Sequence, residues 1–242
     1  MLGDGPCRER VEDLVGIAED GEQIGELGRA KGRVQSASMR SESVRRAVRE
    51  DVPAIAAVLA DAFADYPWTR WTVDAIDHRA RVESLQELAL LDLVLPYGEA
   101  WVHDDPAAGI VSAALWMLPG IAVPTAITER VQLRAAELEG DRHAASVEAE
   151  ARLGPLRPTA PHLYLGAVGT KPTRQGSGSG SAVLRPVLAR ARREAVDVFL
   201  ETSSEANVGF YAQLGFSVVH HVEVRDGGPD VWAMILTTRP AP

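Results

Sequence analysis

The sequence predicts an α/β fold with one mixed sheet, and three observations support this prediction. Segments of strand character and segments with helical spacing follow each other in the order β-α-α-β-β-α-α-β-α-β-α-β-β over most of the chain. The last two strand segments are consecutive, so the sheet cannot be purely parallel. No internal repeat divides the 242 residues, of which 46% are hydrophobic and 24% are charged. A chain of this length and composition can form one soluble α/β domain with an ordinary core.

Composition and charge argue against several classes of function. The formal net charge of −9 disfavours a nucleic-acid or anionic-membrane partner, because both require a basic face. Cys7 is the single cysteine, so we expect no disulfide framework and no metal site built on thiolates. No apolar run is long enough for a membrane span, and the first residues lack the pattern of a secretory signal. We therefore expect a cytoplasmic protein that holds no metal.

The first 42 residues differ in composition from the rest of the chain. Glycine and charged residues dominate this segment, and only 9–19 has any helical character. Such a composition favours poor order, and Met39 offers a second translation start. We interpret residues 1–42 as a poorly ordered, dispensable extension and residues 43–240 as the single folded domain.

The first half of this domain is predicted to hold a strand, two helices and a hairpin. Asp51 followed by Pro53 is a start signal for a helix, with Asp51 as the N-cap. Pro96 and Gly98 are expected to stop the second helix. In order, the expected elements are a strand at 43–48, a helix at 52–63, a helix at 77–95 and a hairpin at 99–120.

The second half is predicted to begin with amphipathic helices rich in Ala, Glu and Arg, and to continue as alternating strands and helices. Gly140 and Asp141 interrupt the first helical stretch. The expected elements are helices within 125–153, a strand at 162–170, a helix at 179–195, a strand at 197–203, a helix at 206–215 and strands at 216–224 and 231–238.

The stretch "RQGSGSGSAVL" carries the main functional signal. Gly/Ser alternation is typical of flexible linkers, but here an apolar strand precedes it and an amphipathic helix follows at once. A Walker loop needs a lysine that this stretch lacks. A dinucleotide fingerprint has partial support from Gly176, Gly178 and the later Glu201, although Ser181 stands at its third glycine position. An NAD(P)-binding oxidoreductase therefore remains an alternative.

The third interpretation is the pattern Gln-x-x-Gly-x-Gly, which Gln175, Gly178 and Gly180 fulfil. Glycines allow backbone N–H groups to gather at the N-terminus of the following helix, where a pyrophosphate binds. Together with the later segment "NVGFYAQLGF", the pattern resembles the GNAT superfamily of acyl-CoA-dependent N-acetyltransferases. Within it, "DVPAIAAVLADAFADYPWTRWTVD", "VFLETS" and "FYAQLGF" are most similar to the puromycin N-acetyltransferase group, over about 44–234.

The resemblance implies a GNAT fold: a mixed, mostly antiparallel sheet with helices on both faces and a helical insertion before the fourth strand. A bulge in the fourth strand separates it from the fifth, and acetyl-CoA lies between them as cosubstrate. Arg174 is open to a second interpretation as a solvated surface residue. The residues that the resemblance assigns to acetyl-CoA are Val168, Gly169, Thr170, Arg174, Gln175, Gly176, Ser177, Gly178, Ser179, Gly180, Ser181, Asn207 and Tyr211.

The resemblance also implies roles for two residues of the predicted helix 206–215. Asn207 and Tyr211 are four residues apart and therefore share one helix face. Asn207 would bind the pantetheine arm, while the Tyr211 phenol would give a proton to the departing thiolate. Packing of Tyr211 beside Phe210 is the structural alternative.

Candidates on the acceptor side are fewer. Tyr66 and Glu201 are the possible bases, and they are also expected to contact the substrate together with Trp68 and Trp116. Each tryptophan has core packing as its alternative role.

The sequence thus predicts acetyl transfer from acetyl-CoA to a primary amine of a small molecule, by direct transfer in a ternary complex. The resemblance points to puromycin or a similar aminonucleoside antibiotic. Peptide or protein α-amines and aminoglycosides are alternative acceptors, and a non-catalytic acetyl-CoA-binding module is a third class. We expect a monomer or a homodimer.

Overall fold

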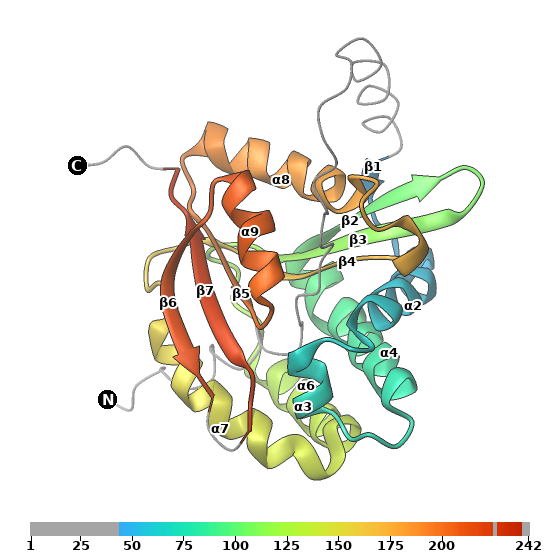
Figure 1. Ribbon diagram of the computed structural model, residues 1–242, viewed down its shortest axis with the longest axis vertical. Helices are drawn as coiled ribbons and strands as arrows, with labels where there is room; N and C mark the ends of the chain where they lie inside the picture. Colours follow the sequence, from blue (N-terminus) through green and yellow to red (C-terminus); the bar gives the residue numbers. More distant parts are fainter. Residues whose placement is uncertain (1–43, 225–226, 239–242) are drawn as a thin grey trace.

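The computed structural model describes residues 44–224 and 227–238, and their strands form one seven-stranded sheet (Figure 1). The predicted extension 1–42 lies outside the described residues, so its interpretation stays a prediction. The strands, in their order across the sheet, are β1 (Val44–Arg46), β2 (Gly98–Asp105), β3 (Gly109–Met117), β4 (Leu163–Thr170), β5 (Val198–Thr202), β7 (Asp230–Leu236) and β6 (Ser217–Glu223).

Strand directions confirm the mixed, mostly antiparallel sheet. Among the described strands, β4 and β5 are the one parallel pair, and all other neighbours are antiparallel. A dinucleotide-binding domain is built on a parallel sheet, so the oxidoreductase alternative is wrong.

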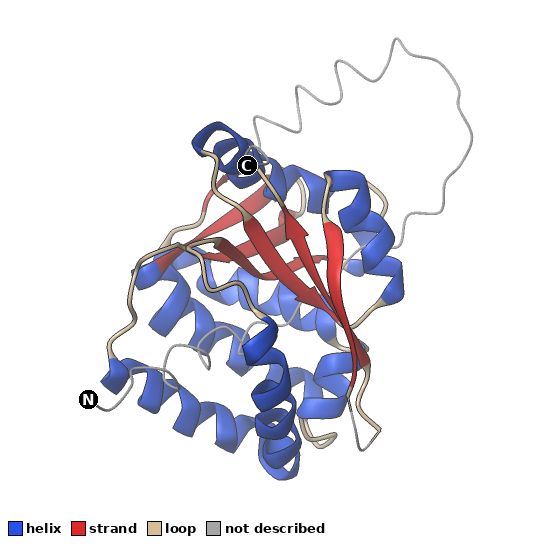
Figure 2. Ribbon diagram, turned by 90° about the vertical axis from the view of Figure 1, so that its left-hand side faces the viewer, coloured by secondary structure: helices blue, strands red, loops and turns tan. Residues whose placement is uncertain are grey.

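Helices cover both faces of the sheet (Figure 2). One face carries α8 (Ser179–Glu194) and α9 (Glu205–Leu214), and we call it the α8/α9 face. The opposite face is called the α2/α7 face. Its helices are α2 (Val52–Phe63), α3 (Pro67–Thr72), α4 (His78–Ala89), α5 (Leu95–Tyr97), α6 (Thr125–Glu139) and α7 (His143–Leu153).

Apolar clusters lie on both faces of the sheet, because alternate residues of a strand point to opposite faces. Phe199 and Ala233 pack on the α2/α7 face with Ile55, Leu59 and other residues of α2 and α4. Neighbouring strand residues join the cluster under α8 and α9: Leu163, Leu165, Val168, Leu200, Met234 and Leu236. The sheet therefore separates two cores that share no strand side chain.

The second predicted helix extends further than expected. It continues from α4 through a π-helical turn, Leu90–Val94, and α5, and it ends at Tyr97. Pro96 does not stop it, because Pro is tolerated in the first turn of the short final segment. Gly98 begins β2, and a Cβ there would lie 2.0 Å from the carbonyl oxygen of Trp116.

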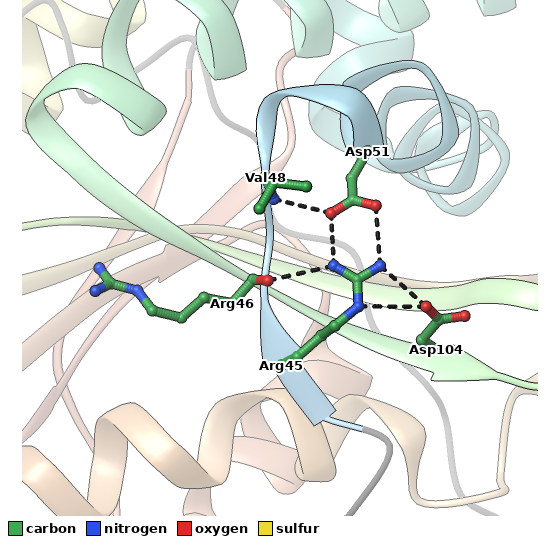
Figure 3. Close-up of polar contacts among 5 residues, drawn as sticks. All are labelled: Arg45, Arg46, Val48, Asp51 and Asp104. Atoms are coloured by element: carbon green, nitrogen blue, oxygen red, sulfur yellow. Dashed lines mark hydrogen bonds and ion pairs between the residues drawn. The ribbon is translucent and has the colours of Figure 1, made fainter.

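Asp51 stands at the predicted N-cap position of α2, but its side chain makes no capping hydrogen bond to that helix. It has helical dihedrals, because a 3₁₀ turn, Arg49–Asp51, leads directly into α2. Its carboxylate instead accepts the Val48 N–H at 2.8 Å and the Arg45 guanidinium at 2.7 and 2.9 Å (Figure 3). Arg45 also donates to Asp104 on β2, and its hydrogen bonds lower the pKa of Asp51.

Candidate active site

The central feature of the site is the point at which β4 and β5 separate. Only three residue pairs join these strands, from Leu163↔Val198 to Leu165↔Leu200. The β3–β4 register shifts directly afterwards, since Leu115 pairs with Ala167 but Trp116 pairs with Leu165, which leaves Gly166 as a bulge. We call the unpaired edges beyond it, 166–170 of β4 and 201–202 of β5, the strand divergence. The predicted bulge and separation are thus present.

Backbone groups of two predicted contact residues point into the strand divergence. The Lys171 N–H donates to Val111 on β3 at 2.8 Å, and lateral direction alternates along a strand. The N–H and C=O of Thr170 and Val168 therefore point away from β3, toward the divergence. Both residues present unpaired backbone groups where the resemblance places pantetheine.

Gly169 lies between these two residues and is oriented differently. Its carbonyl oxygen faces β3 and accepts a hydrogen bond from the Ser112 hydroxyl at 3.0 Å. A Cβ at this position would lie 2.9 Å from both Ala62 Cβ and Leu59 Cδ2 of α2. The geometry gives Gly169 a packing role, because it lets α2 approach the sheet closely.

The Gly/Ser stretch forms a turn that leads directly into α8. Gly176 and Gly178 have φ values of 71° and 78°, a region that residues with a Cβ rarely adopt. The first backbone bond into α8 runs from Ala182 N–H to the Gly178 carbonyl at 3.1 Å. The N–H groups of Ser179, Gly180 and Ser181 precede it, so the helix itself gives them no acceptor. This arrangement suits an anion.

Side chains around this turn are partly engaged with one another. The hydroxyls of Ser177 and Ser179 are 2.7 Å apart, whereas Gln175 is exposed. Arg174 pairs with Asp105 at the tip of the β2–β3 hairpin, at 3.0 Å. The N–H groups of Ala107 and Ala108, together with Arg174, lower the pKa of Asp105. Arg174 therefore forms an ion pair on the surface, with its side chain 41% exposed.

The predicted helix residues Asn207 and Tyr211 lie buried on the α8/α9 face. Tyr211 is fully buried, with ring centroids 5.2 Å from Phe210 and 5.6 Å from Phe216. It belongs to the same cluster as Val168 of β4. Asn207 donates from Nδ2 to the Thr202 hydroxyl at 3.2 Å, which fixes its amide at the end of β5.

Tyr66 joins the α2–α3 corner to the end of β5. Its hydroxyl accepts the Ser203 N–H at 2.6 Å and lies 3.0 Å from the Thr202 hydroxyl. The Trp68 N–H donates to the Ser203 hydroxyl at 3.1 Å. Because Thr202 also binds Asn207, a chain of hydrogen bonds runs from Tyr66 through the strand end to α9.

Glu201 lies on β5 just beyond the last β4–β5 pair, and two residues that sequence reasoning missed bind it. Arg157, in the loop before β4, donates to Glu201 Oε2 at 3.1 and 2.8 Å. It also donates to Glu150 of α7 at 2.7 and 3.2 Å. The Tyr164 hydroxyl donates to the same Glu201 oxygen at 3.3 Å. Glu150 shares the buried side of α7 with Ala149 and Leu153, and this spacing was the signal available in the sequence.

The two tryptophans predicted to contact substrate lie on opposite faces. Trp68 is half-buried on the α2/α7 face, where it packs against Trp71 near α7. Trp116 is fully buried in the cluster under α8 and α9. Its strand register turns the indole toward α8 and away from Glu201, which favours the alternative of core packing for Trp116. The described residues contain no group of acidic, His and Cys side chains that could hold a metal. They also contain no helix with the length and apolarity that a membrane span requires.

Comparison with known proteins supports an acyltransferase. A family model described as "Acetyltransferase (GNAT) family" matches residues 133–216. A crystal structure from Corynebacterium glutamicum ATCC 13032, described as histone acetyltransferase HPA2 and related acetyltransferase, is similar. It is 29% identical, with 83% of this chain and 97% of that chain covered and a TM-score of 0.65.

Two more distant structures have TM-scores below 0.5. A GNAT family acetyltransferase from Brucella melitensis in complex with acetyl-CoA is 16% identical, covering 82% of this chain and 89% of that chain, with a TM-score of 0.44. Naa20 from Chaetomium thermophilum in complex with a bisubstrate analogue is 17% identical, covering 80% and 85%, also with a TM-score of 0.44. The family model and the Corynebacterium structure show that this chain has the GNAT fold predicted from the sequence, and acetyltransferases of the matched family use acetyl-CoA.

Proposed function

We propose that this protein transfers the acetyl group of acetyl-CoA to a primary amine of a small molecule, by direct attack in a ternary complex. One observation carries the proposal: at the strand divergence β4 and β5 are no longer paired, so groups on the two faces of the sheet can approach each other there. The strand divergence lies between Tyr211 on the α8/α9 face and Glu201, which is bound to Arg157 on the α2/α7 face. A donor on one face and an acceptor on the other can meet there.

The donor side would be held mainly by backbone groups. The turn at Gly176 and Gly178 is followed by N–H groups at the start of α8 that have no backbone acceptor among the described residues, and this arrangement fits a pyrophosphate. Backbone groups of Val168 and Thr170 fit the pantetheine arm. When bound, acetyl-CoA supplies an activated acetyl group. An N–H at Val168 that polarises its carbonyl would contribute about 3–4 kcal/mol, as in comparable oxyanion sites.

Proton movements would use side chains on both faces. Tyr211 Oη holds a proton for the departing sulfur, because the sulfur leaves more easily as a neutral thiol than as a thiolate. An α-amine has a pKa near 7.7, so a sizeable neutral fraction is present at physiological pH. A weak base then suffices, and Glu201 and Tyr66 are the candidates on the acceptor side.

The acceptor is proposed to be aromatic, with puromycin or a similar aminonucleoside as the first candidate. Trp68 is half-buried beside the Tyr66 corner and could stack against an aromatic group. α6 and α7 form the insertion before β4, and Glu150 of α7 reaches the site. Such an enzyme could inactivate an antibiotic.

The test is a thiol-release assay with acetyl-CoA. Puromycin is compared with aminoglycosides, amino-acid amides and peptides, and the product is identified by mass spectrometry. Rapid thiol release with puromycin supports the proposal in full. Preference for a peptide would retain acetyl transfer and overturn the small-molecule acceptor, whereas no thiol release with any amine would overturn the function itself.

A further inference from the structure

A buried ion cluster stands at the acceptor end of the strand divergence. Arg157 binds Glu150 at 2.7 Å and Glu201 at 2.8 Å, and we call these three residues the acidic triad. Their side chains are only 6%, 10% and 9% exposed, respectively. The surface ion pair Arg79–Asp61, by comparison, has side chains that are 49% and 40% exposed. The triad is therefore far less screened by solvent.

Three separate parts of the chain supply the triad. Glu150 comes from α7, Arg157 from the loop before β4, and Glu201 from the end of β5. The planar guanidinium uses its fork to hold both carboxylates, a geometry that lysine cannot reproduce. Arg157 consequently fixes the rotation of the Glu201 carboxylate.

One oxygen of this carboxylate is unused. Glu201 Oε2 accepts Arg157 and Tyr164, whereas Glu201 Oε1 is buried and has no hydrogen-bond partner among the described residues. A buried charged oxygen without a partner is costly. Two carboxylates against one guanidinium also leave a formal charge of −1 in the triad. A ligand group that donates an N–H and carries a positive charge would give Glu201 Oε1 a hydrogen-bond partner and would balance the negative charge of the triad.

We propose that the acidic triad is a specificity site: Glu201 Oε1 accepts an N–H of the acceptor's amino group, and the residual negative charge excludes amines with a carboxylate on the adjacent carbon. This inference rests on the proposed function and names its substrate class as amines next to an amide, ester or other uncharged group, not free amino acids. Glu150 and Arg157 are positioning residues that act through Glu201.

The experiment compares phenylalaninamide with phenylalanine, which differ at the carboxyl group. The wild type should favour the amide by about 100-fold or more in kcat/KM, because like charges placed together across a buried contact are strongly unfavourable. The two α-amines also differ in pKa, so the decisive quantity is the change in this ratio between variants. Glu150→Gln removes the residual charge and should reduce the ratio at least about tenfold, with an unchanged KM for acetyl-CoA.

Two further variants separate charge from structure. Glu148→Gln also removes one negative charge from α7, but Glu148 is 56% exposed and pairs with Arg152, so the ratio should stay at the wild-type value. Glu150→Asp keeps the charge and should keep the ratio, even if its shorter side chain lowers kcat. A merely structural triad would lower activity toward both substrates equally and leave the ratio unchanged.

The possible failures are distinguishable. If no amine of any kind releases thiol, the proposed function fails. The inference alone is overturned if the wild type acetylates both compounds equally well, or if it acetylates other amines but neither of these. It is likewise overturned if folded Glu150→Gln keeps the wild-type ratio, or if Glu148→Gln lowers the ratio as much.

Discussion

The α8/α9 face and the α2/α7 face present different kinds of chemical group at the strand divergence. On the α8/α9 face, the groups proposed to bind acetyl-CoA are mostly backbone N–H and C=O groups, placed by glycines with positive φ and by a bulge. On the α2/α7 face, the groups proposed to bind the acceptor are side chains held by long-range hydrogen bonds, such as Tyr66 to Thr202 and Arg157 to Glu201. A backbone cradle suits a constant cosubstrate, whereas side chains can be exchanged as acceptors change.

The largest expected effect tests the proton donor on the α8/α9 face. Tyr211→Phe removes one buried hydroxyl and should lower kcat by about 10²–10⁴, because general acid catalysis contributes that much. The dissociation constant of acetyl-CoA, measured by calorimetry, should stay within about twofold, since a phenyl ring fills the same space between Phe210 and Phe216. An unchanged kcat would remove Tyr211 from the mechanism.

The corresponding change on the α2/α7 face is Tyr66→Phe. It leaves the buried Ser203 N–H and the Thr202 hydroxyl without the phenol oxygen, which costs about 1–3 kcal/mol of stability. We expect kcat/KM for the amine to fall about tenfold or more, with little change in the KM for acetyl-CoA. Steady-state kinetics with each substrate varied in turn checks this. An effect confined to acetyl-CoA would contradict the division between the faces.

The backbone cradle is tested by adding one methyl group. A Cβ at Gly176 would meet no neighbouring atom, so Gly176→Ala causes no steric clash. Its cost comes from the left-handed backbone at φ 71°, which is about 1–2 kcal/mol less favourable for alanine. The KM for acetyl-CoA should rise about tenfold while the KM for the amine is unchanged. Gly120→Ala is the matched control, since it has φ 76° and equally open space but lies outside the loop. An equal rise in the KM for acetyl-CoA in both variants would contradict the proposal that the loop at Gly176 binds the cosubstrate.

A smaller effect concerns stability and pH, at the start of α2 and away from the strand divergence. Asp51→Asn should lower the free energy of unfolding by about 1 kcal/mol at pH 7 and leave kcat unchanged. Because Arg45 lowers the folded-state pKa of Asp51 below its unfolded value near 3.9, the stabilisation is present above that value. It should disappear as pH falls through the folded-state pKa.

Denaturant titrations of both proteins between pH 7 and pH 3 measure this difference. Asp61→Asn breaks the more exposed pair with Arg79 and should cost less at every pH. A difference that grows at acid pH would have the wrong sign and would contradict the assignment.

The smallest effect is expected from truncation. A chain that starts at Met39 should match the full chain in kcat, in both KM values and in melting temperature, because residues 1–42 are proposed to be dispensable. A fall in activity toward the amine alone would instead assign the extension to the acceptor side.

Local patterns explain how much could be predicted from the sequence. Glycine at positive φ, an apolar strand and an amphipathic helix are adjacent in sequence around Gly178, so the loop and the order of elements could be predicted. Arg157 binds Glu201 across 44 residues, and Tyr66 reaches Thr202 across 136 residues, so no local pattern marks either contact. The face of the sheet on which Trp116 lies could not be predicted either, because alternation along a strand shows that neighbours face opposite sides but not which side each one takes.

The short junction between β4 and β5 also limits how such an enzyme can evolve. Only three strand pairs join β4 to β5, and the Tyr66 and Arg157 contacts add further links between β5 and the first part of the fold. Residues that are proposed to lie on the acceptor side thus also tie the two parts of the sheet together. Each gain of substrate range is then expected to lower thermal tolerance unless a compensating mutation arises elsewhere.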